Sequence, residues 1–224
     1  MQKKQNYNRL KELAYQAGAV LFGVAALSDY KPQIHSELEC QISELPYGIS
    51  MGIELSRAVL DTITEQPTLI YSWHYRQINS RLDQMVLSLS QFIQAQNYLS
   101  LPIAASQVVD WENQKAHLSH KHLAQAAGLG WIGRNNLLVN KKFGSAIRLV
   151  SILTNMPLVT DTPVGFGCGD CYECLAVCPT QAIEKENKDF RYRDCFEKLK
   201  QFSRLPQIKY YICGVCVKVC AGKR

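Results

Sequence analysis

The sequence predicts an α/β domain, an α+β sandwich with a mixed sheet, over residues 1–160, and a small cysteine-rich module over residues 161–224. Two observations predict this division. Helical and extended segments alternate through the first part, whereas eight of the nine cysteines fall in the last quarter. With 224 residues and 47% apolar content, the chain is long enough for one sizeable core and an appended module.

The elements of the first domain follow from the spacing of apolar residues. Helical spacing predicts helices over residues 6–17, 49–63, 76–97 and 115–127. Apolar runs bounded by turn residues predict strands or extended segments over residues 19–26, 67–73, 101–110, 136–140 and 146–153. Lys141 to Gly144 separates the last two strands and predicts a hairpin. Pro157 to Gly167, which is rich in proline and glycine, is the predicted joint to the module.

The N-terminus superficially resembles a secretion signal, because four basic residues precede an apolar run over residues 17–27. Glu12 interrupts the basic region, however, and apolar residues keep helical spacing through it. No apolar stretch approaches the roughly 20 residues needed to span a bilayer. We therefore expect a cytoplasmic protein without a membrane partner.

The clustered cysteines have a spacing that predicts two [4Fe–4S] clusters in a ferredoxin-like module. The first run is Cys168-x2-Cys171-x2-Cys174-x3-Cys178 with Pro179 after it, and the second set is Cys195 and then Cys213-x2-Cys216-x3-Cys220. Short x2 spacings let one loop present successive thiolates to different irons, whereas the x3 spacing carries the next cysteine to the other cluster. We therefore assign Cys168, Cys171, Cys174 and Cys220 to cluster one. Cluster two takes Cys178, Cys195, Cys213 and Cys216.

Two other uses of these cysteines are less consistent with the spacing. Two zinc sites would also take eight thiolates, but zinc gives no reason for three consecutive x2-spaced cysteines followed by x3 and proline. Disulfides require an oxidising compartment, and the total of nine cysteines is odd. Cys40 is the cysteine left over, and we expect it to be a buried or free thiol.

The positive charge of the chain is confined to its end. Residues 185–224 contain 11 Lys and Arg against 4 Asp and Glu, a net charge of +7, whereas residues 1–184 carry 14 against 15, or −1. One interpretation is compensation of cluster charge, since a [4Fe–4S]2+ core with four thiolates carries about −2. The other is a docking face for an acidic electron donor or for nucleic-acid phosphates. Both interpretations stay open at this point.

A glycine-rich segment, Gly128-Leu-Gly130-Trp131-Ile-Gly133, matches the G-x-G-x-x-G pattern of dinucleotide-binding proteins. That mechanism requires a strand before the glycines and a helix after them, whereas the predicted order here is the reverse. We therefore reject a nicotinamide dinucleotide site. The glycines either let a large flat group approach the backbone, with Arg134, Asn135 and Asn136 at its rim, or form a helix cap followed by a tight turn.

At this segment the sequence resembles the epoxyqueuosine reductases, which are tRNA-modifying enzymes. The resemblance rests on Ala126 to Asn135, on Leu137-Leu-Val and Gly144, and on the cysteine runs at 168–183 and 213–220. It implies that a corrinoid such as cobalamin sits over the α/β domain and that two [4Fe–4S] clusters feed it electrons, an arrangement that reductive dehalogenases share. It further implies corrinoid contacts from Gly128, Gly130, Trp131, Gly133, Arg134, Asn135 and Asn136, and a flavodoxin- or ferredoxin-type donor.

The chain also departs from the pattern of that family. It stops four residues after Cys220, where the family continues into a helical-repeat region that helps hold tRNA, so we expect a short form. Transfer RNA as a partner is therefore less strongly implied than the cofactors. The catalytic aspartate of the family lies in a Val-Asp-Thr-x-Pro stretch, and its nearest match here is Asp110, which lacks the proline.

Several further polar residues are candidates for proton transfer. His117, His120 and His122 precede the glycines, but only the first two share a helical face, which argues against a three-histidine metal site. One of the three is a candidate proton donor or corrinoid neighbour. Tyr71, His74 and Tyr75 form a similar group, in which Tyr75 is a candidate acid.

Two functions follow from these predictions. The first is a corrinoid-dependent reductase that receives electrons through the clusters. The second is a two-cluster electron carrier that reduces or reactivates a corrinoid on another protein.

Overall fold

The computed structural model describes residues 1–28, 38–111 and 115–222, and the predicted leftover thiol of Cys40 lies outside the described side chains. The chain folds into two compact units. The first comprises Met1–Ile53, Asn79–Leu129 and Arg148–Val164, and the second comprises Glu54–Ile78, Gly130–Ile147 and Gly165–Arg224. The prediction had a single boundary between residues 160 and 161. The chain instead also passes between the units at four earlier points. Three of them lie within β2, α4 and β6, and the fourth follows Leu129.

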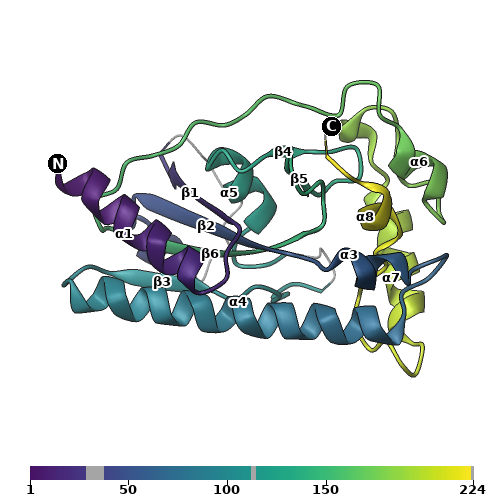
Figure 1. The fold of residues 1–224 in the computed structure, drawn as a ribbon, viewed down its shortest axis with the longest axis horizontal. Coiled ribbons are helices and arrows are strands. Elements are labelled where there is room, and N and C mark those ends of the chain that lie inside the picture. Colours follow the sequence, from purple (N-terminus) through teal and green to yellow (C-terminus); the bar gives the residue numbers. More distant parts are fainter. Residues whose placement is uncertain (29–37, 112–114, 223–224) are drawn as a thin grey trace. The chain divides into compact units, whose positions relative to one another are not determined.

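The first unit is built around a four-stranded sheet with the order β1-β2-β6-β3 (Figure 1). Its elements are α1 (Gln2–Gln16), β1 (Leu21–Ala26), α2 (Glu39–Ile42), β2 (Tyr47–Glu54), most of α4 (Leu69–Ala95), β3 (Ser100–Ile103), α5 (His120–Ala126) and β6 (Ile147–Thr154). Strands β1 and β2 pair antiparallel, as do β3 and β6. The predicted α/β architecture is therefore confirmed.

Helices α1 and α5 pack against β1. Two glycines allow α5 to approach the sheet, because a Cβ atom at Gly23 would meet the Ala127 carbonyl and one at Gly48 would meet the Leu123 side chain. In the β1–β2 register Gly48 lies opposite Ala25, so both glycines are on the same face of the sheet. Small residues on that face thus fix the position of α5 and of the chain that follows it.

The second unit contains little regular structure. Its elements are α3 (Arg57–Asp61), the start of α4, β4 (Trp131–Ile132), β5 (Leu138–Val139), α6 (Glu173–Val177), the 3-10 turn η2 (Asn187–Asp189), α7 (Tyr192–Ser203) and α8 (Val215–Val219). Strands β4 and β5 pair antiparallel, and α8 packs against both α6 and α3. The core gathers Leu60, Ile63, Tyr71, Ile212 and Val215.

Two predicted elements in the first part of the chain are wrong. Residues 49–63 were expected to be helical, but they form the end of β2 and then α3. Apolar side chains at 49, 51 and 53 alternate with small ones at 48, 50 and 52, a period of two that is characteristic of a strand. Residues 67–73 were expected to be a strand, but α4 begins there, because the Thr68 hydroxyl accepts a hydrogen bond from the Tyr71 amide at 3.3 Å and caps the helix.

The predicted hairpin between residues 136–140 and 146–153 is also wrong in its pairing. A tight turn does exist, closed by a bridge between Asn140 and Gly144. Strand β5 pairs with β4, however, and β6 lies between β2 and β3. The two sides of the turn continue into different units, so they do not extend a common ladder.

The remaining predicted elements are confirmed with shifted ends. The helices expected at 6–17 and 76–97 are α1 and α4, and the strand at 19–26 is β1. The helix expected at 115–127 is limited to α5, and the extended segment at 101–110 to β3. Among the described residues, no helix has the length and apolar content to cross a membrane.

Candidate metal-cluster site

Eight cysteine thiols of the second unit are free, and seven of them are partly buried while Cys171 is exposed. Cys168 and Cys171 lie in the loop before α6, Cys174 lies in α6, and Cys178 follows it. Cys195 lies in α7, and Cys213, Cys216 and Cys220 lie before, within and after α8. We call Cys168, Cys171, Cys174 and Cys220 the first thiol group, and Cys178, Cys195, Cys213 and Cys216 the second thiol group.

The first thiol group gathers around Cys174. The pKa of the Cys174 thiol is raised to about 12, and the largest cause is burial. The charges of three other thiols, Cys220, Cys168 and Cys171, raise this pKa further. Cys220 is 46 residues away from Cys174 in the sequence, but it caps α8, which packs against the helix α6 that contains Cys174.

The second thiol group gathers in the same manner. Burial and then the charges of Cys213 and Cys178 raise the pKa of Cys195 to about 11. The pKa of Cys216 is raised well above its usual value, by burial first and then by the charges of Cys213, Cys195, Cys174 and Cys178 in that order. Cys174 belongs to the first thiol group, so the two groups adjoin each other at Cys174 and Cys216.

Two short helices distribute the thiols between the groups. Cys174 lies within α6 and Cys178 is its C-cap, while Cys216 lies within α8 and Cys220 is its C-cap. Both caps have extended backbone, with φ and ψ of −66° and 116° at Cys178 and −80° and 97° at Cys220. Since α6 and α8 pack against each other, the cysteines of both helices lie in the same part of the unit.

Trp131 contacts the first thiol group directly. Its indole N–H donates to Cys168 Sγ at 3.3 Å, and its ring packs so closely on Gly167 that a Cβ atom there would lie 2.9 Å from the ring. Gly133 also faces this thiol, since a Cβ atom built on it would lie 3.6 Å from Cys168 Sγ. Hydrogen bonds to ligand sulfur are one of the means by which proteins tune a cluster.

Arg134 holds the cysteine loop from inside. Its side chain is only 6% exposed. The guanidinium donates to the carbonyls of Cys171 at 3.0 Å, Gly169 at 2.8 Å and Lys185, and it lies 4.4 Å from the centre of the Tyr172 ring. The fork of N–H groups thus satisfies loop carbonyls that no helix or strand would satisfy, a role different from the corrinoid rim contact expected for this residue.

Two other basic side chains of the second unit, Arg57 and Lys218, also donate hydrogen bonds to backbone carbonyls. Arg57 donates to the carbonyls of Lys218 at 2.8 Å and Cys220 at 3.3 Å. Lys218 donates to the carbonyls of Asp61 at 3.2 Å and Ile63 at 2.6 Å. Sequence analysis missed Arg57 and Lys218, because an isolated basic residue gives no signal of the distant carbonyl that it reaches.

The glycines of the segment have packing roles. Gly128 has a φ of 72°, and its amide and that of Leu129 donate to the carbonyls of Gln125 and Ala124, which forms a Schellman cap at the end of α5. A Cβ atom at Gly130 would collide with the Val139 carbonyl, and one at Gly133 with the Val139 side chain. The helix cap and tight turn therefore account for the glycines.

Two asparagines complete the turn. Asn135 is buried and donates to the Ser145 hydroxyl at 3.1 Å, while its side-chain oxygen accepts from the Leu137 amide at 3.3 Å. Asn136 has a φ of 57° and occupies the left-handed position of the turn. Trp131, Arg134 and Asn135 are all buried in contacts with their own unit.

The candidate proton donors have varied surroundings. Asp110 belongs to the first unit, where it is bridged to Lys115 by two backbone hydrogen bonds. His120, on α5, is buried between the Ser151 hydroxyl and the Ala104 carbonyl, each at 2.8 Å. Burial lowers the pKa of His120 to about 4, despite the opposing hydrogen bond to Ala104, so this imidazole is neutral at pH 7.

The second group of candidates lies in the second unit. His74 accepts a hydrogen bond from the Ser56 amide at 3.0 Å, and burial lowers its pKa. Tyr71 is part of the core, and the Tyr75 ring packs against Tyr210 with a centroid separation of 5.6 Å.

Similar sequences identify the relatives of the chain, although no family model matches it. An epoxyqueuosine reductase from Aliivibrio fischeri is 37% identical over 49% of this chain and 32% of that protein. A second one, from Salmonella typhimurium, is 28% identical over 79% of this chain and 47% of that protein. The chain is a homologue of the epoxyqueuosine reductases. A tetrachloroethene reductive dehalogenase from Sulfurospirillum multivorans is 28% identical over 95% of the chain and 49% of its own length.

This epoxyqueuosine reductase homologue therefore spans between a third and a half of the length of these relatives. Its fold matches solved structures of both classes. The epoxyqueuosine reductase from Streptococcus thermophilus has a TM-score of 0.66 at 19% identity, over 95% of this chain and 65% of that one. A reductive dehalogenase, for which a B12-dependent dehalogenation mechanism is suggested, has a TM-score of 0.73 at 20% identity, over 97% of this chain and 32% of that one.

Proposed function

We propose that the chain is an iron–sulfur reductase in which each thiol group holds one [4Fe–4S] cluster. The observation that carries the proposal is the packing of α6 against α8, two short helices that each contain one cysteine and end in another. The spacing of the cysteines in the sequence supports the same assignment independently.

The donor set fits cubane clusters better than single ions. Among the described residues, no group of three or more His, Cys, Asp or Glu side chains could hold one metal ion. Four ligands of one zinc ion must converge on a point about 2.3 Å from each sulfur, whereas the ligands of a cubane reach four different irons. The consecutive x2, x2 and x3 spacings of Cys168, Cys171, Cys174 and Cys178 therefore favour the cluster.

When bound, two such clusters would supply one-electron transfer in sequence. The chain's own residues define the surroundings of each cluster. The Trp131 indole donates to a ligand sulfur of the first thiol group, Arg134 fixes the backbone on both sides of Cys171, and Lys198 is close enough to lower the pKa of Cys213 in the second. Positive charge next to both groups offsets the net negative charge of clusters with four thiolates.

The electron acceptor that we propose is a corrinoid, and the reaction is the reduction of an epoxide, a halide or a similar substrate. This part rests on the likeness to the epoxyqueuosine reductases and to a B12-dependent dehalogenase. The residues that we propose to contact the corrinoid are those that the family resemblance implies, namely Gly128, Gly130, Trp131, Gly133, Arg134, Asn135 and Asn136. An acidic flavodoxin- or ferredoxin-type donor and, through the basic face, tRNA are the proposed partners.

A second function is favoured by the glycine segment itself. Because Trp131, Arg134 and Asn135 are engaged within the second unit, the chain would also suit an electron carrier that reduces a corrinoid on another protein. The two functions share the clusters and differ in where the corrinoid is held.

Anaerobic reconstitution separates the two functions. The protein is loaded with iron and sulfide, incubated with hydroxocobalamin, desalted, and examined by visible and EPR spectroscopy. Retained cobalamin with a Co(II) signal beside broad cluster absorption near roughly 400 nm is the result expected for the reductase. Clusters without retained cobalamin would support the carrier, and a protein without clusters would refute both.

A further inference from the structure

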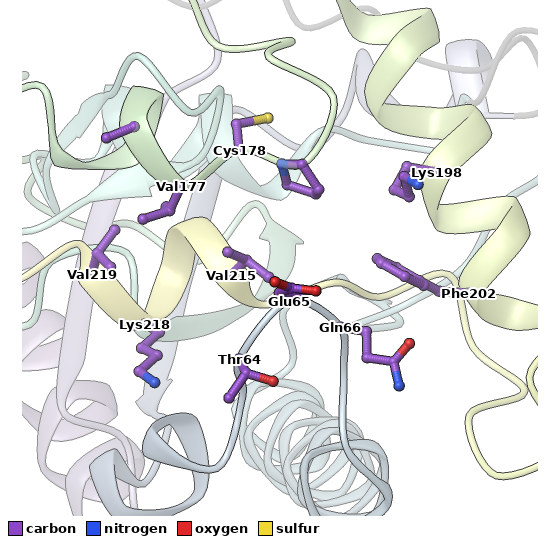
Figure 2. A pocket seen from close by; sticks show the side chains of 12 residues that line it. Thr64, Glu65, Gln66, Val177, Cys178, Lys198, Phe202, Val215, Lys218 and Val219 are labelled. Atoms are coloured by element: carbon purple, nitrogen blue, oxygen red, sulfur yellow. The ribbon is translucent and has the colours of Figure 1, made fainter.

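The second unit has a cavity of about 860 Å³ next to the second thiol group (Figure 2). Cys178 and Pro179 form one side of it, Lys198 and Phe202 of α7 another, and Glu65 and Gln66 belong to the loop on a third. Cys178 is partly exposed here, so a proposed cluster ligand is accessible from outside at this point.

The two thiol groups thus have different surroundings. Cys168 of the first is covered by Trp131, which donates to its sulfur, whereas Cys178 of the second lines an open cavity. An electron that arrives from a soluble carrier docked at this cavity would enter through the second thiol group, whose Cys178 lines it. The first thiol group would receive it afterwards, because the groups adjoin at Cys174 and Cys216.

An apolar patch follows the cavity along the chain. Three residues after Gln66, the first turns of α4 expose Leu69, Ile70 and Trp73 to 47%, 52% and 57%. Leu69 and Trp73 are four residues apart, so they lie on the same face of the helix and are separated by about 6 Å along its axis. Contiguous exposed apolar side chains with a tryptophan are typical of protein interaction sites, where tryptophan is a frequent anchor.

The charges near the cavity favour an acidic partner. Among the described residues that line it, Lys198 and Lys218 are basic and Glu65 is the only carboxylate. Lys218 is engaged with backbone carbonyls, which leaves Lys198 as the main cation toward a partner. The surrounding segment 185–224 has a net charge of +7, which would attract an acidic protein over a longer range.

We propose that the cavity and the Leu69, Ile70 and Trp73 patch together form the docking face for an acidic flavodoxin- or ferredoxin-type electron carrier. The inference rests on the proposed function and specifies where its electrons enter. The docked carrier is oxidised by one electron, and the cluster of the second thiol group is reduced from the 2+ to the 1+ state at Cys178. No covalent bond forms or breaks in this step.

Stopped-flow spectroscopy tests the proposal on the anaerobically reconstituted protein. Reduced flavodoxin is mixed with wild type, Trp73→Ala, Lys198→Gln or Glu65→Gln, and bleaching near roughly 400 nm is followed; a parallel series uses reduced ferredoxin. We expect Trp73→Ala to slow the reduction at least about tenfold and Lys198→Gln to slow it about threefold. Glu65→Gln should accelerate it at low salt, because it removes a charge that repels the carrier.

Matched controls use exposed residues of the first unit. Leu87→Ala removes an apolar side chain that is 54% exposed, and Lys4→Gln removes an exposed charge; neither should alter the rate. Dithionite, which needs no docking face, should reduce Trp73→Ala, Glu65→Gln and both controls at the wild-type rate and thereby shows that their clusters are intact. For Lys198→Gln, whose lost charge also acts on Cys213, the rate with the carrier is divided by the rate with dithionite.

Each contrary result has a distinct meaning. If dithionite bleaches the wild type but both carriers fail to do so, or if Trp73→Ala reacts with them at the wild-type rate, the docking face is overturned and the clusters remain. If Trp73→Ala only converts a dimer to a monomer in size-exclusion chromatography, the patch binds a second copy of the chain and the proposal is equally overturned. If dithionite bleaches nothing, the proposed function itself fails and this inference fails with it.

Discussion

The two units of the molecule satisfy their buried backbone by different means. In the first unit the ladders of a four-stranded sheet pair the backbone groups, and buried polar side chains such as His120 and Ser151 bond to each other as neutral partners. In the second unit the strands have two residues each and most helices have five. Its loop carbonyls are therefore bonded by cations, among them Arg57, Arg134 and Lys218.

This difference explains why positive charge concentrates where it does. In a loop that surrounds a cluster, many backbone carbonyls have no hydrogen-bond partner within a helix or sheet. Each of these carbonyls that is buried requires another hydrogen-bond donor. Arginine can supply several N–H groups at once, and its charge also counters the negative charge that two clusters would add. Within the basic segment 185–224, Lys218 and Arg191 bond to backbone carbonyls in this way, so part of its positive charge has a structural role separate from any role in binding partners.

The largest expected effect comes from removing a cysteine ligand from one thiol group while the other group is left intact. Cys220→Ser and Cys216→Ser change residues four apart at α8, and each should lower the iron content from about eight to about four per chain. The double variant Cys168→Ser/Cys220→Ser should keep about four, because both residues belong to the first thiol group. Cys168→Ser/Cys216→Ser should keep almost none, and equal iron in the two double variants would contradict the crossed assignment.

Arg134 tests whether a cation is needed to hold the loop. Replacement by glutamine removes the buried guanidinium, which donates to three backbone carbonyls. We expect the free energy of unfolding, measured by urea titration, to fall by about 3 kcal/mol. Arg193→Gln, at an exposed position of α7, is the matched control and should change stability by less than about 0.5 kcal/mol. Equal effects of the two substitutions would show that the loop does not depend on Arg134.

His120 provides the corresponding test in the first unit, where buried polar groups are neutral. Its folded-state pKa is about 4, below the unfolded value of about 6.5. The stability that this neutral histidine contributes is therefore present above pH 6.5 and is lost as the pH falls toward 4. Between pH 7 and pH 5 the wild type should lose about 2 kcal/mol through this residue. The His120→Gln variant should lack that component, and parallel pH profiles for the two proteins would contradict the assignment.

The smallest expected effect concerns the indole that contacts Cys168. Trp131→Phe keeps the ring but removes the N–H donor at 3.3 Å. A hydrogen bond of about 0.5–1.5 kcal/mol corresponds to roughly 20–60 mV for a one-electron couple. We expect the potential of the first cluster to become more negative by this amount, in a redox titration followed by EPR. A shift confined to the second cluster would contradict the grouping of the thiols.

The assignment of the cysteines to two clusters stays a prediction from their spacing, which reflects how one loop presents several thiolates to a cluster. Cys174 and Cys178 differ by four residues and are separated by the end of one short helix, which the x3 spacing and Pro179 already suggest. The strongly periodic helix α4 and the buried strand β1 were predictable because one pattern of burial runs along each.

Glycines and isolated cations were less predictable from sequence. A glycine fits equally where a ligand approaches and where a protein carbonyl does, and Gly130 proves to face the Val139 carbonyl. Arg57 reaches a carbonyl 163 residues away, which no local pattern encodes. Strand β2 was missed because both of its faces are buried, so the alternation between small and large side chains was mistaken for helical spacing.

The most direct test of the two-cluster account is the metal content of the wild-type protein after anaerobic reconstitution. Iron, acid-labile sulfide and zinc would be quantified per chain, and Mössbauer spectra would identify the type of cluster. The account predicts about eight irons and eight sulfides in [4Fe–4S]2+ form. A preparation that holds zinc, or about four irons per chain, would contradict it.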